Sequence, residues 1–315
     1  MKYIIITDTS ANLPTPLLNA RGIEVLPFSY YIDGKEYSCL DTERFDSAAF
    51  YDAIRKGTKV NTSLISPQAY YDFFKPHLEA GKDILFIGMS SGISGSFEKS
   101  LLVKEQLLQE FPERCIECVD TLGASLGEGL LVLKAAELNA AGVTLQINAD
   151  TLRSLIPHMC QVFTVNDLMH LKRTGRLSNA AAVVATVLNI KPLLKGDENG
   201  RIVSFAKLVG RKRSIEAIAE QYKKLVENPS EQMIGIAHAD CAKDAYYLAV
   251  LINRYAPPKE ILTVDYEPVT GSHVGPGALA LFFLDSRDFR SGIRKSNATE
   301  QLNERLIRSA SSSDA

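Results

Sequence analysis

The sequence predicts an α/β protein made of two α/β domains, the first with a mainly parallel sheet and helices on both of its faces. Short apolar strands alternate with helix-periodic segments through the first half of the chain, which is typical of a parallel sheet. The chain has 315 residues, enough for two domains of ordinary size. Near residue 150 the pattern restarts and includes a hairpin, so we expect a mixed second domain. The predicted boundaries are 1–149, 150–284 and a polar tail at 285–315.

The elements of the first domain are predicted from apolar runs and from residues that start or stop helices. Strands are expected at 3–7, 24–28, 29–32, 35–37, 84–87 and 116–120, with a hairpin turn at 33–34. Helices are expected at 13–21, 47–55, 67–81, about 97–111 and from about 124. Asn12 and Ser66 are the expected caps of the first and third helices, because their side chains accept hydrogen bonds from free N–H groups.

The second domain mixes hairpin and strand–helix units. Strands are expected at 161–165, 233–238, 261–266 and 278–284, with a hairpin formed by 191–194 and 201–206. Helices are expected at 151–156, 168–173, 177–188, 213–227 and 242–255. The segment 271–277 is glycine-rich and is expected to be a loop. In the tail, 299–307 is expected to form at most one helix, since its apolar content is too low for independent folding.

Composition and charge exclude several classes of function. A net charge of −2 argues against binding to nucleic acid or to an anionic membrane, which needs a large basic surface. The longest apolar run, 180–190, is interrupted by Thr186 and Asn189 and is shorter than the roughly 18 residues of a membrane span. The first residues read as a strand without a cleavage site, so we expect a cytoplasmic protein.

The five cysteines do not form a disulfide framework, because their number is odd and the chain is long. Cys115 and Cys118 have the spacing of a metal-binding pair, but neither a second pair nor a nearby histidine completes a site. We therefore interpret the cysteines as structural thiols and expect no metal.

The segment 89–97, Met-Ser-Ser-Gly-Ile-Ser-Gly-Ser-Phe, is the strongest candidate for a binding site. It joins an apolar strand to a periodic helix, and the free N–H groups at a helix start attract anions. Glycine lets the backbone approach a ligand, and serine hydroxyls both donate and accept. The alternative is an ordinary strand-to-helix turn with Ser94 as the helix cap.

Polar residues follow two other predicted strands. Asp8 and Thr9 come after the first strand, and Asp120 ends the strand at 116–120. Ligands of open α/β sheets usually bind at the carboxyl ends of strands, so these residues are candidates for the same site. The alternative is that Asp8 and Asp120 only hold loop conformations by accepting backbone N–H groups.

Taken together, these stretches resemble the bacterial DegV family. The resemblance covers residues 3 to about 284 and is carried by Thr7-Asp8-Thr9-Ser10-Ala11-Asn12-Leu13-Pro14, Thr62-Ser63, Ser90-Ser91-Gly92-Ile93-Ser94-Gly95-Ser96-Phe97, Val119-Asp120-Thr121, Asp167-Leu168, Gly175-Arg176-Leu177-Ser178, Asn189-Ile190-Lys191-Pro192 and Gly271-Ser272-His273-Val274-Gly275-Pro276-Gly277. Each piece is weakly specific, but chance does not readily place all of them in this order. Thr9 and Thr121 stand where serine is common in the family.

The resemblance implies two α/β domains with a long-chain fatty acid between them and no cofactor. It also implies a non-catalytic role: such proteins present the bound carboxylate to a separate fatty acid kinase, the ATP-using partner that makes the acyl phosphate for phospholipid metabolism. An acyltransferase or a membrane surface is implied only as a transient partner. By position, Thr62, Ser94 and His273 match the carboxylate-contacting residues, with Gly95 beside them and Arg176 near the head group. Asp8, Thr9, Ser63 and Asp120 match supporting loops.

Elementary chemistry agrees with this assignment. A carboxylate removed from water needs several hydrogen bonds, and the hydroxyls, the imidazole and the helix N–H groups supply them. An acyl chain contributes about 0.8 kcal/mol per buried methylene, so an apolar tunnel would provide most of the affinity. The candidate walls are Phe28, Ile65, Ile93, Leu126 and the helix at 180–188.

Some of these residues have structural alternatives. Thr62 could bond a neighbouring backbone group, and Arg176 could neutralise the carbonyls at a helix C-terminus. The basic run 211–213 reads as a solvated helix start, with a partner-docking patch as the alternative.

The rival function is an acyl hydrolase or transferase with Ser94 as nucleophile and His273 as base. The segment 92–96 misses the Gly-x-Ser-x-Gly pattern of such enzymes by its last residue. A phosphate-binding loop of the Gly-x-x-x-x-Gly-Lys-Ser/Thr type is absent from the sequence, so ATP chemistry would need a partner.

Overall fold

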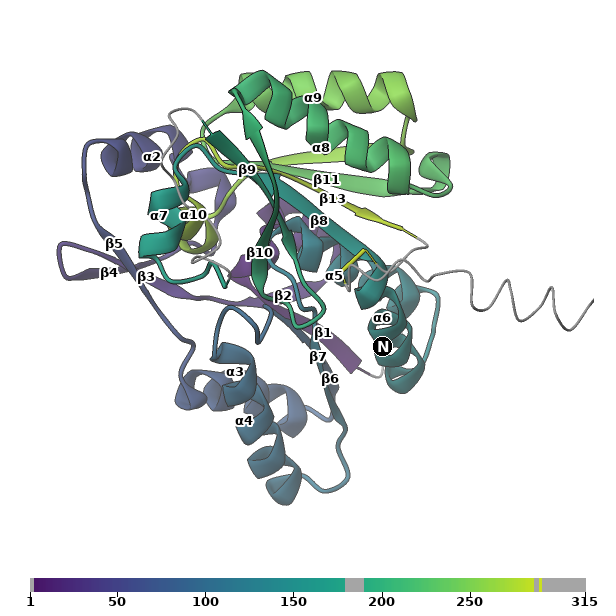
Figure 1. The fold of residues 1–315 in the computed structure, drawn as a ribbon. Coiled ribbons are helices and arrows are strands. Elements are labelled where there is room, and N and C mark those ends of the chain that lie inside the picture. Colours follow the sequence, from purple (N-terminus) through teal and green to yellow (C-terminus); the bar gives the residue numbers. More distant parts are fainter. Residues whose placement is uncertain (1–2, 179–189, 286–288, 291–315) are drawn as a thin grey trace, which may run out of the picture.

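The computed structural model describes residues 3–178, 190–285 and 289–290, and these confirm the predicted α/β class. A four-stranded sheet of order β2-β1-β6-β7 is entirely parallel, and a six-stranded sheet of order β10-β9-β8-β13-β11-β12 is mixed. A small antiparallel sheet, β4-β3-β5, lies beside them. Helices cover both outer faces and fill the space between the two large sheets (Figure 1).

The parallel sheet is built from apolar strands whose alternate residues enter two separate cores. Its strands are β1 (Tyr3–Asp8), β2 (Ile23–Leu26), β6 (Asp83–Gly88) and β7 (Ile116–Asp120). Ile4 and Ile6 pack toward α3 (Pro67–Glu79) and α4 (Ser96–Glu110), while Tyr3 and Ile5 face α5 (Leu126–Ala140) and α6 (Leu145–Leu155). This is the period-two alternation of a sheet that is buried on both faces.

The small sheet contains β3 (Ser29–Ile32), β4 (Lys35–Ser38) and β5 (Val60–Ser63), and α2 (Ser47–Arg55) lies between β4 and β5 in the chain. The hairpin turn at Asp33-Gly34 is confirmed, with positive φ angles of 50° and 80°. β5 was not predicted, because its sequence Val-Asn-Thr-Ser is short and polar. It pairs antiparallel with β3 and places Thr62 opposite Tyr30.

The second sheet contains β8 (Met159–Thr164), β9 (Ile190–Gly196), β10 (Ile202–Val209), β11 (Met233–His238), β12 (Glu260–Asp265) and β13 (Leu279–Leu284). The amphipathic helices α8 (Arg211–Leu225) and α9 (Ala242–Tyr255) cover its outer face. The helix expected at 213–227 is confirmed as α8, whose residues Ile215, Ile218 and Tyr222 are buried against the sheet. The remaining helices are α1 (Thr15–Arg21), α7 (Leu168–Arg173) and α10 (Pro268–Val274), with 3-10 turns η1 (Thr9–Ala11), η2 (Thr42–Arg44), η3 (Ile156–His158) and η5 (Pro229–Glu231).

Helix α5 is sandwiched between the two large sheets (Figure 1). Its first two turns are buried on all sides, as expected for a helix with a core on both faces. The small residues allow this close packing: a Cβ on Gly129 would lie 2.4 Å from the carbonyl oxygen of Ala11, and one on Gly127 would lie 2.7 Å from the amide of Gln161. The two sheets therefore approach each other around α5, and the cavity described below lies beside its N-terminus.

Helix boundaries were predicted well where a capping residue was correctly identified. Ser66 caps α3 by accepting the N–H of Ala69, as predicted. The prediction for Asn12 was wrong: α1 begins after Pro14, and Asn12 instead ends η1 in a left-handed conformation. Its side chain accepts the N–H of Glu267 and donates to Ser125, because these long-range partners outweigh a local cap.

One further helix differs in extent from its prediction, and two others cannot be checked. The helix expected at 151–156 is the longer α6, which begins at Leu145 after the Thr144 cap and packs against the first sheet, so position 150 falls within it. The helices expected at 177–188 and 299–307 lie outside the described residues. Within the described residues, none of the helices has the length and apolar content needed to cross a membrane.

Candidate ligand-binding site

The candidate site lies at the carboxyl ends of β1, β6 and β7, where loops from the first sheet meet the second sheet. In the parallel sheet, β1 lies between β2 and β6. The chain passes from β1 to β2 on one side and later returns to β6 on the other side. Such a change of direction opens a crevice at the strand ends. The loops after β6 and β7 line this crevice, and the small sheet and α10 close it.

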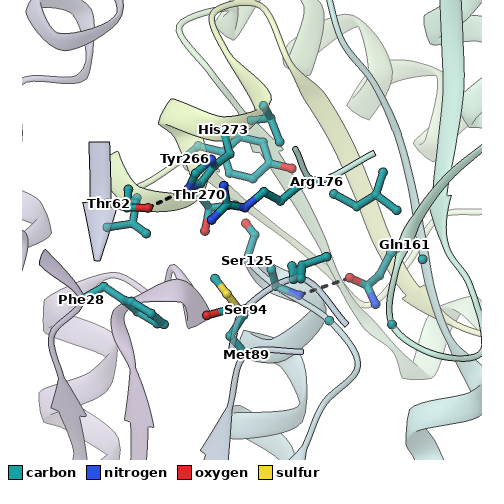
Figure 2. Close-up of a pocket in the computed structure, with 18 of the residues that line it drawn as sticks. Phe28, Thr62, Met89, Ser94, Ser125, Gln161, Arg176, Tyr266, Thr270 and His273 are labelled. Carbon is teal, nitrogen blue, oxygen red and sulfur yellow. Dashed lines mark hydrogen bonds between the residues drawn. The ribbon is translucent and has the colours of Figure 1, made fainter. Parts of the chain in front are cut away.

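The crevice contains a cavity that is lined by apolar side chains and by several polar groups (Figure 2). The apolar walls come from both halves of the chain: Phe28, Leu64, Met89, Ile93, Leu122, Ala124, Phe163, Ile202, Tyr266, Val269, Val274 and Phe282. The polar lining consists of Thr62, Ser63, Ser94, Ser125, Gln161, Arg176, Thr270 and His273. Of the predicted walls, Phe28 and Ile93 lie here, whereas Ile65 and Leu126 are buried in the adjoining core and do not line the cavity. The helix expected at 180–188 lies outside the described residues.

Thr62 and His273 form the polar centre of the cavity. Thr62 Oγ1 and His273 Nε2 are 2.9 Å apart and hydrogen-bonded, although the residues come from β5 and α10 (Figure 2). Thr62 therefore bonds a side chain across the site and not a neighbouring backbone group. The Nδ1 atom of His273 is buried and has no hydrogen-bond partner among the described residues.

His273 is a neutral imidazole at physiological pH. Burial lowers its pKa, electrostatic interaction with Arg176 and His170 lowers it further, and the resulting pKa is about 3. A neutral ring carries one proton and can donate from one nitrogen only. When Nε2 carries it, His273 donates to Thr62, and the Thr62 hydroxyl proton is then available to a ligand.

His273 lies on a helix, whereas a loop was expected at 271–277. The segment expected to be a loop contains the end of α10, a short helix that begins after Glu267. The Glu267 carboxylate accepts the N–H groups of Val269 and Thr270, and this cap stabilises a helix that glycine would otherwise disfavour. Burial raises the pKa of Glu267 to about 7, while these N–H groups oppose the increase.

Ser94 and Gly95 precede α4 directly. Gly95 occupies the cap position of the helix, and Ser94 Oγ accepts the N–H of Ser96 at 3.3 Å. Ser94 thus makes a local bond at the helix start and also lines the cavity. Gly95 does not line the cavity itself, but lies at the helix N-terminus, where unpaired N–H groups create a positive potential.

Arg176 makes the helix C-terminal contact that was its structural alternative, and its side chain also lines the cavity. Its Nη1 donates to the carbonyl of Thr174 at the C-terminus of α7, and its side chain reaches into the cavity toward Thr62 and His273 (Figure 2). Burial lowers the pKa of the guanidinium, which nevertheless remains charged because its ordinary value is far above neutral. Arg176 therefore makes this end of the cavity electropositive.

Asp8, Thr9 and Asp120 hold the loops of the site and do not line the cavity. Asp8 accepts the N–H groups of Ser10 and Met89, and Thr9 Oγ1 accepts that of Phe28. Asp120 accepts the N–H groups of Ser91 and Leu122. Ser63, in contrast, lines the cavity beside Thr62.

Several lining residues were missed by sequence reasoning. Gln161 and Phe163 lie on β8, and Phe282 is the cross-strand neighbour of Gln161 on β13. Their strands were predicted, but which face of the second sheet meets the first depends on tertiary packing. Ser125 and Thr270 were also missed. For Ser125, the backbone φ of 53° gives the loop after β7 a shape that sequence does not reveal.

Ser94 and His273, the nucleophile and base of the rival hypothesis, have different hydrogen-bond partners. Among the described residues no hydrogen bond joins Ser94 to His273, and the partner of His273 is Thr62. Across residues 3–178, 190–285 and 289–290, no group of three His, Cys, Asp or Glu side chains is arranged to bind a metal ion.

The fold and the site together define an α/β protein with two large sheets and a mostly apolar cavity between them. The chain belongs to the DegV family, whose model, described as an uncharacterised protein family, matches residues 2–286. It is 38% identical over 284 residues to a DegV domain-containing protein of Clostridium perfringens, covering 90% of this chain and 97% of that one.

Solved structures show the same architecture. A DegV family protein from Thermus thermophilus, described by its fatty acid binding, superposes with a TM-score of 0.81 at 29% identity and covers 90% of this chain and 100% of that one. A fatty-acid-binding DegV family protein from Streptococcus agalactiae gives a TM-score of 0.80 at 29% identity, covering 91% and 100%.

Proposed function

We propose that this protein binds a long-chain fatty acid in the cavity and presents its carboxylate to a separate fatty acid kinase, which converts it to acyl phosphate. The observation that carries the proposal is the cavity itself, in which aromatic and aliphatic walls lead to one electropositive, hydrogen-bonding end. Family relatives of similar structure are described as fatty-acid-binding proteins.

The polar end suits a carboxylate. The hydroxyls of Thr62 and Ser94 donate, Arg176 supplies charge, and the N-terminus of α4 adds a favourable dipole. Hydrogen bonds to a charged partner contribute about 1.5–3 kcal/mol each. Neutral His273 donates to Thr62 and thereby orients the Thr62 hydroxyl. The head group would therefore be held in one orientation, as a kinase requires of its substrate.

The first test identifies the ligand. Protein purified from a bacterial host is denatured, and the released small molecules are analysed by mass spectrometry. We expect a long-chain fatty acid in near-stoichiometric amount, because about 0.8 kcal/mol per buried methylene makes loss during purification slow. Absence of any acyl mass after mild purification would refute the proposal.

The second test separates presentation from retention. In Ser94→Ala or His273→Ala, phosphorylation by the kinase should fall by roughly ten-fold or more, while fatty acid retention falls less, because the acyl chain provides most of the affinity. Ser154→Ala, which removes an exposed hydroxyl on α6, is the matched control. Phosphorylation unchanged in both site variants would show that the carboxylate is held elsewhere.

A further inference from the structure

Gln161 is a polar side chain in an otherwise apolar row. Alternate residues of β8 face the first sheet, and its neighbours in that row, Met159 and Phe163, are buried in the core between the sheets. Its cross-strand partner on β13 is Phe282, which lines the cavity with it. Gln161 is half-buried, and a partly buried amide still needs hydrogen-bond partners, so packing alone does not account for glutamine at this position.

The amide of Gln161 is held against the loop that follows β7. Its Nε2 donates to the carbonyl of Leu122, and its Oε1 accepts the N–H of Ala124, each at 3.4 Å. Glycines make room for it: a Cβ on Gly123 would lie 2.9 Å from Nε2, and one on Gly127 would lie 2.7 Å from the amide carbon. The side chain thus spans from the second sheet to the first and forms a wall.

This wall stands at the far end of the cavity from the polar centre. Figure 2 shows Gln161 on the opposite side of the cavity from Thr62. Gly196, which also lines the cavity, is close to the amide, since a Cβ on Gly196 would be 3.7 Å from Gln161 Nε2. Arg290 Nη1 donates to the same Leu122 carbonyl that accepts from Gln161. Among the described lining residues, Gln161 and Gly196 therefore bound the side of the cavity that lies opposite Thr62.

We propose that Gln161 forms the end wall of the acyl cavity and sets the length of the longest saturated chain that it accepts. This inference rests on the proposed function above. The terminal methyl of a fatty acid gains nothing from a polar wall, and moving the amide would break both of its hydrogen bonds. Discrimination between homologues that differ by one methylene in a tight apolar pocket is typically 10- to 200-fold.

The experiment measures which chain the protein selects. Delipidated full-length protein is incubated with equal amounts of myristic, palmitic, stearic and arachidic acids, and the bound acids are quantified by mass spectrometry. In Gln161→Ala, the ratio of the next longer acid to the one that the wild type prefers should rise about ten-fold. Gln161→Leu fills a similar volume without the hydrogen bonds, so it should keep the wild-type preference.

Gln161→Asn, a smaller change, should give an intermediate shift and provides the measurement if the alanine variant does not fold. An unchanged length distribution in the alanine and asparagine variants would overturn the inference while leaving the proposed function intact. An equal shift in the leucine variant would also overturn it, because the amide would then act only as an anchor of the loop. Wild-type protein that takes up none of the four acids would instead refute both.

Discussion

At the scale of single residues, the site depends on a pair that sequence places far apart. Thr62 and His273 are separated by 211 positions, yet their side chains are hydrogen-bonded. His273 keeps a pKa of about 3 because burial removes water and Arg176 adds a positive charge nearby. The charge state of this imidazole is therefore set by its surroundings and can be tested through stability.

Replacing His273 by glutamine should reduce the sensitivity of the protein to mild acid. In the unfolded chain His273 gains a proton below about pH 6.5, whereas in the folded protein it stays neutral down to about pH 3. The unfolded state therefore binds more protons in this window, and the wild type loses stability as pH falls through it.

Urea denaturation of the wild type and His273→Gln at pH 7.5 and pH 5 measures the effect. The loss of unfolding free energy between the two pH values should be smaller in the variant. An identical loss in both proteins would mean that His273 is protonated in the folded state.

At the scale of elements, α10 connects the two halves of the chain. It carries His273 at its C-terminal end, packs against α2, β3 and β5, and also contacts α7. It is only seven residues long, and helices this short are marginal without tertiary support. The Glu267 cap and the bond from its backbone N–H to Asn12 provide that support.

Removal of the cap in Glu267→Ala should destabilise the protein by about 1–2 kcal/mol, because two buried N–H groups lose their acceptor. Fatty acid release, followed by transfer to vesicles, should become faster, since His273 would be held less firmly. Glu267→Gln keeps one carbonyl acceptor and serves as the matched control, with a smaller effect on both measurements. Equal release rates in wild type and alanine variant would show that α10 does not depend on its cap.

At the scale of the whole molecule, the β9–β10 hairpin of the second sheet contacts the loop that follows β6 in the first sheet. Ser90 Oγ donates to the carbonyl of Gly200 at 2.9 Å, and a Cβ on Gly92 would lie 2.2 Å from the carbonyl oxygen of Asn199. This backbone-to-backbone approach closes the cavity at the side of Ile202. The contact requires glycine on both partners.

Gly200→Ala should weaken this contact. The new Cβ would lie 2.1 Å from Ser90 Oγ and 3.0 Å from the Cα of Leu122, so we expect a loss of about 1–3 kcal/mol from overpacking. Gly142→Ala is the matched control, because Gly142 has a similar positive φ, 79° against 70°, and nothing within 4 Å of its Cβ position. Thermal or urea unfolding of the two variants compares them directly; equal losses would indicate backbone strain alone.

Most of the fold was predictable because local patterns agree with the tertiary structure. Buried strands such as β6 are continuous apolar runs, and α3 has a capping serine followed by proline at its start. The failures were elements that depend on distant partners. β5 is polar and forms through pairing with β3, and α10 contains glycine and depends on a buried cap.

Only part of the cavity lining was predictable from the sequence. The residues that form its polar end, Thr62, Ser94, Arg176 and His273, were all singled out from motifs, and the structure brings them around one cavity. Gln161 and Ser125 were not, because no local pattern distinguishes them from ordinary strand or turn residues. Their importance arises from the loop after β7 and from the face that β8 turns toward the first sheet.

The sequence by itself determined the α/β class, most strands and helices, the family and the chemistry of the polar end, because these depend on local periodicity and on short motifs. Only the tertiary structure decided that His273 bonds Thr62 and is neutral, that α10 is a helix, and which residues of the second sheet line the cavity. Each of those features arises from contacts between residues distant in the chain, and burial by those contacts changes the hydrogen bonding and the pKa of the groups involved.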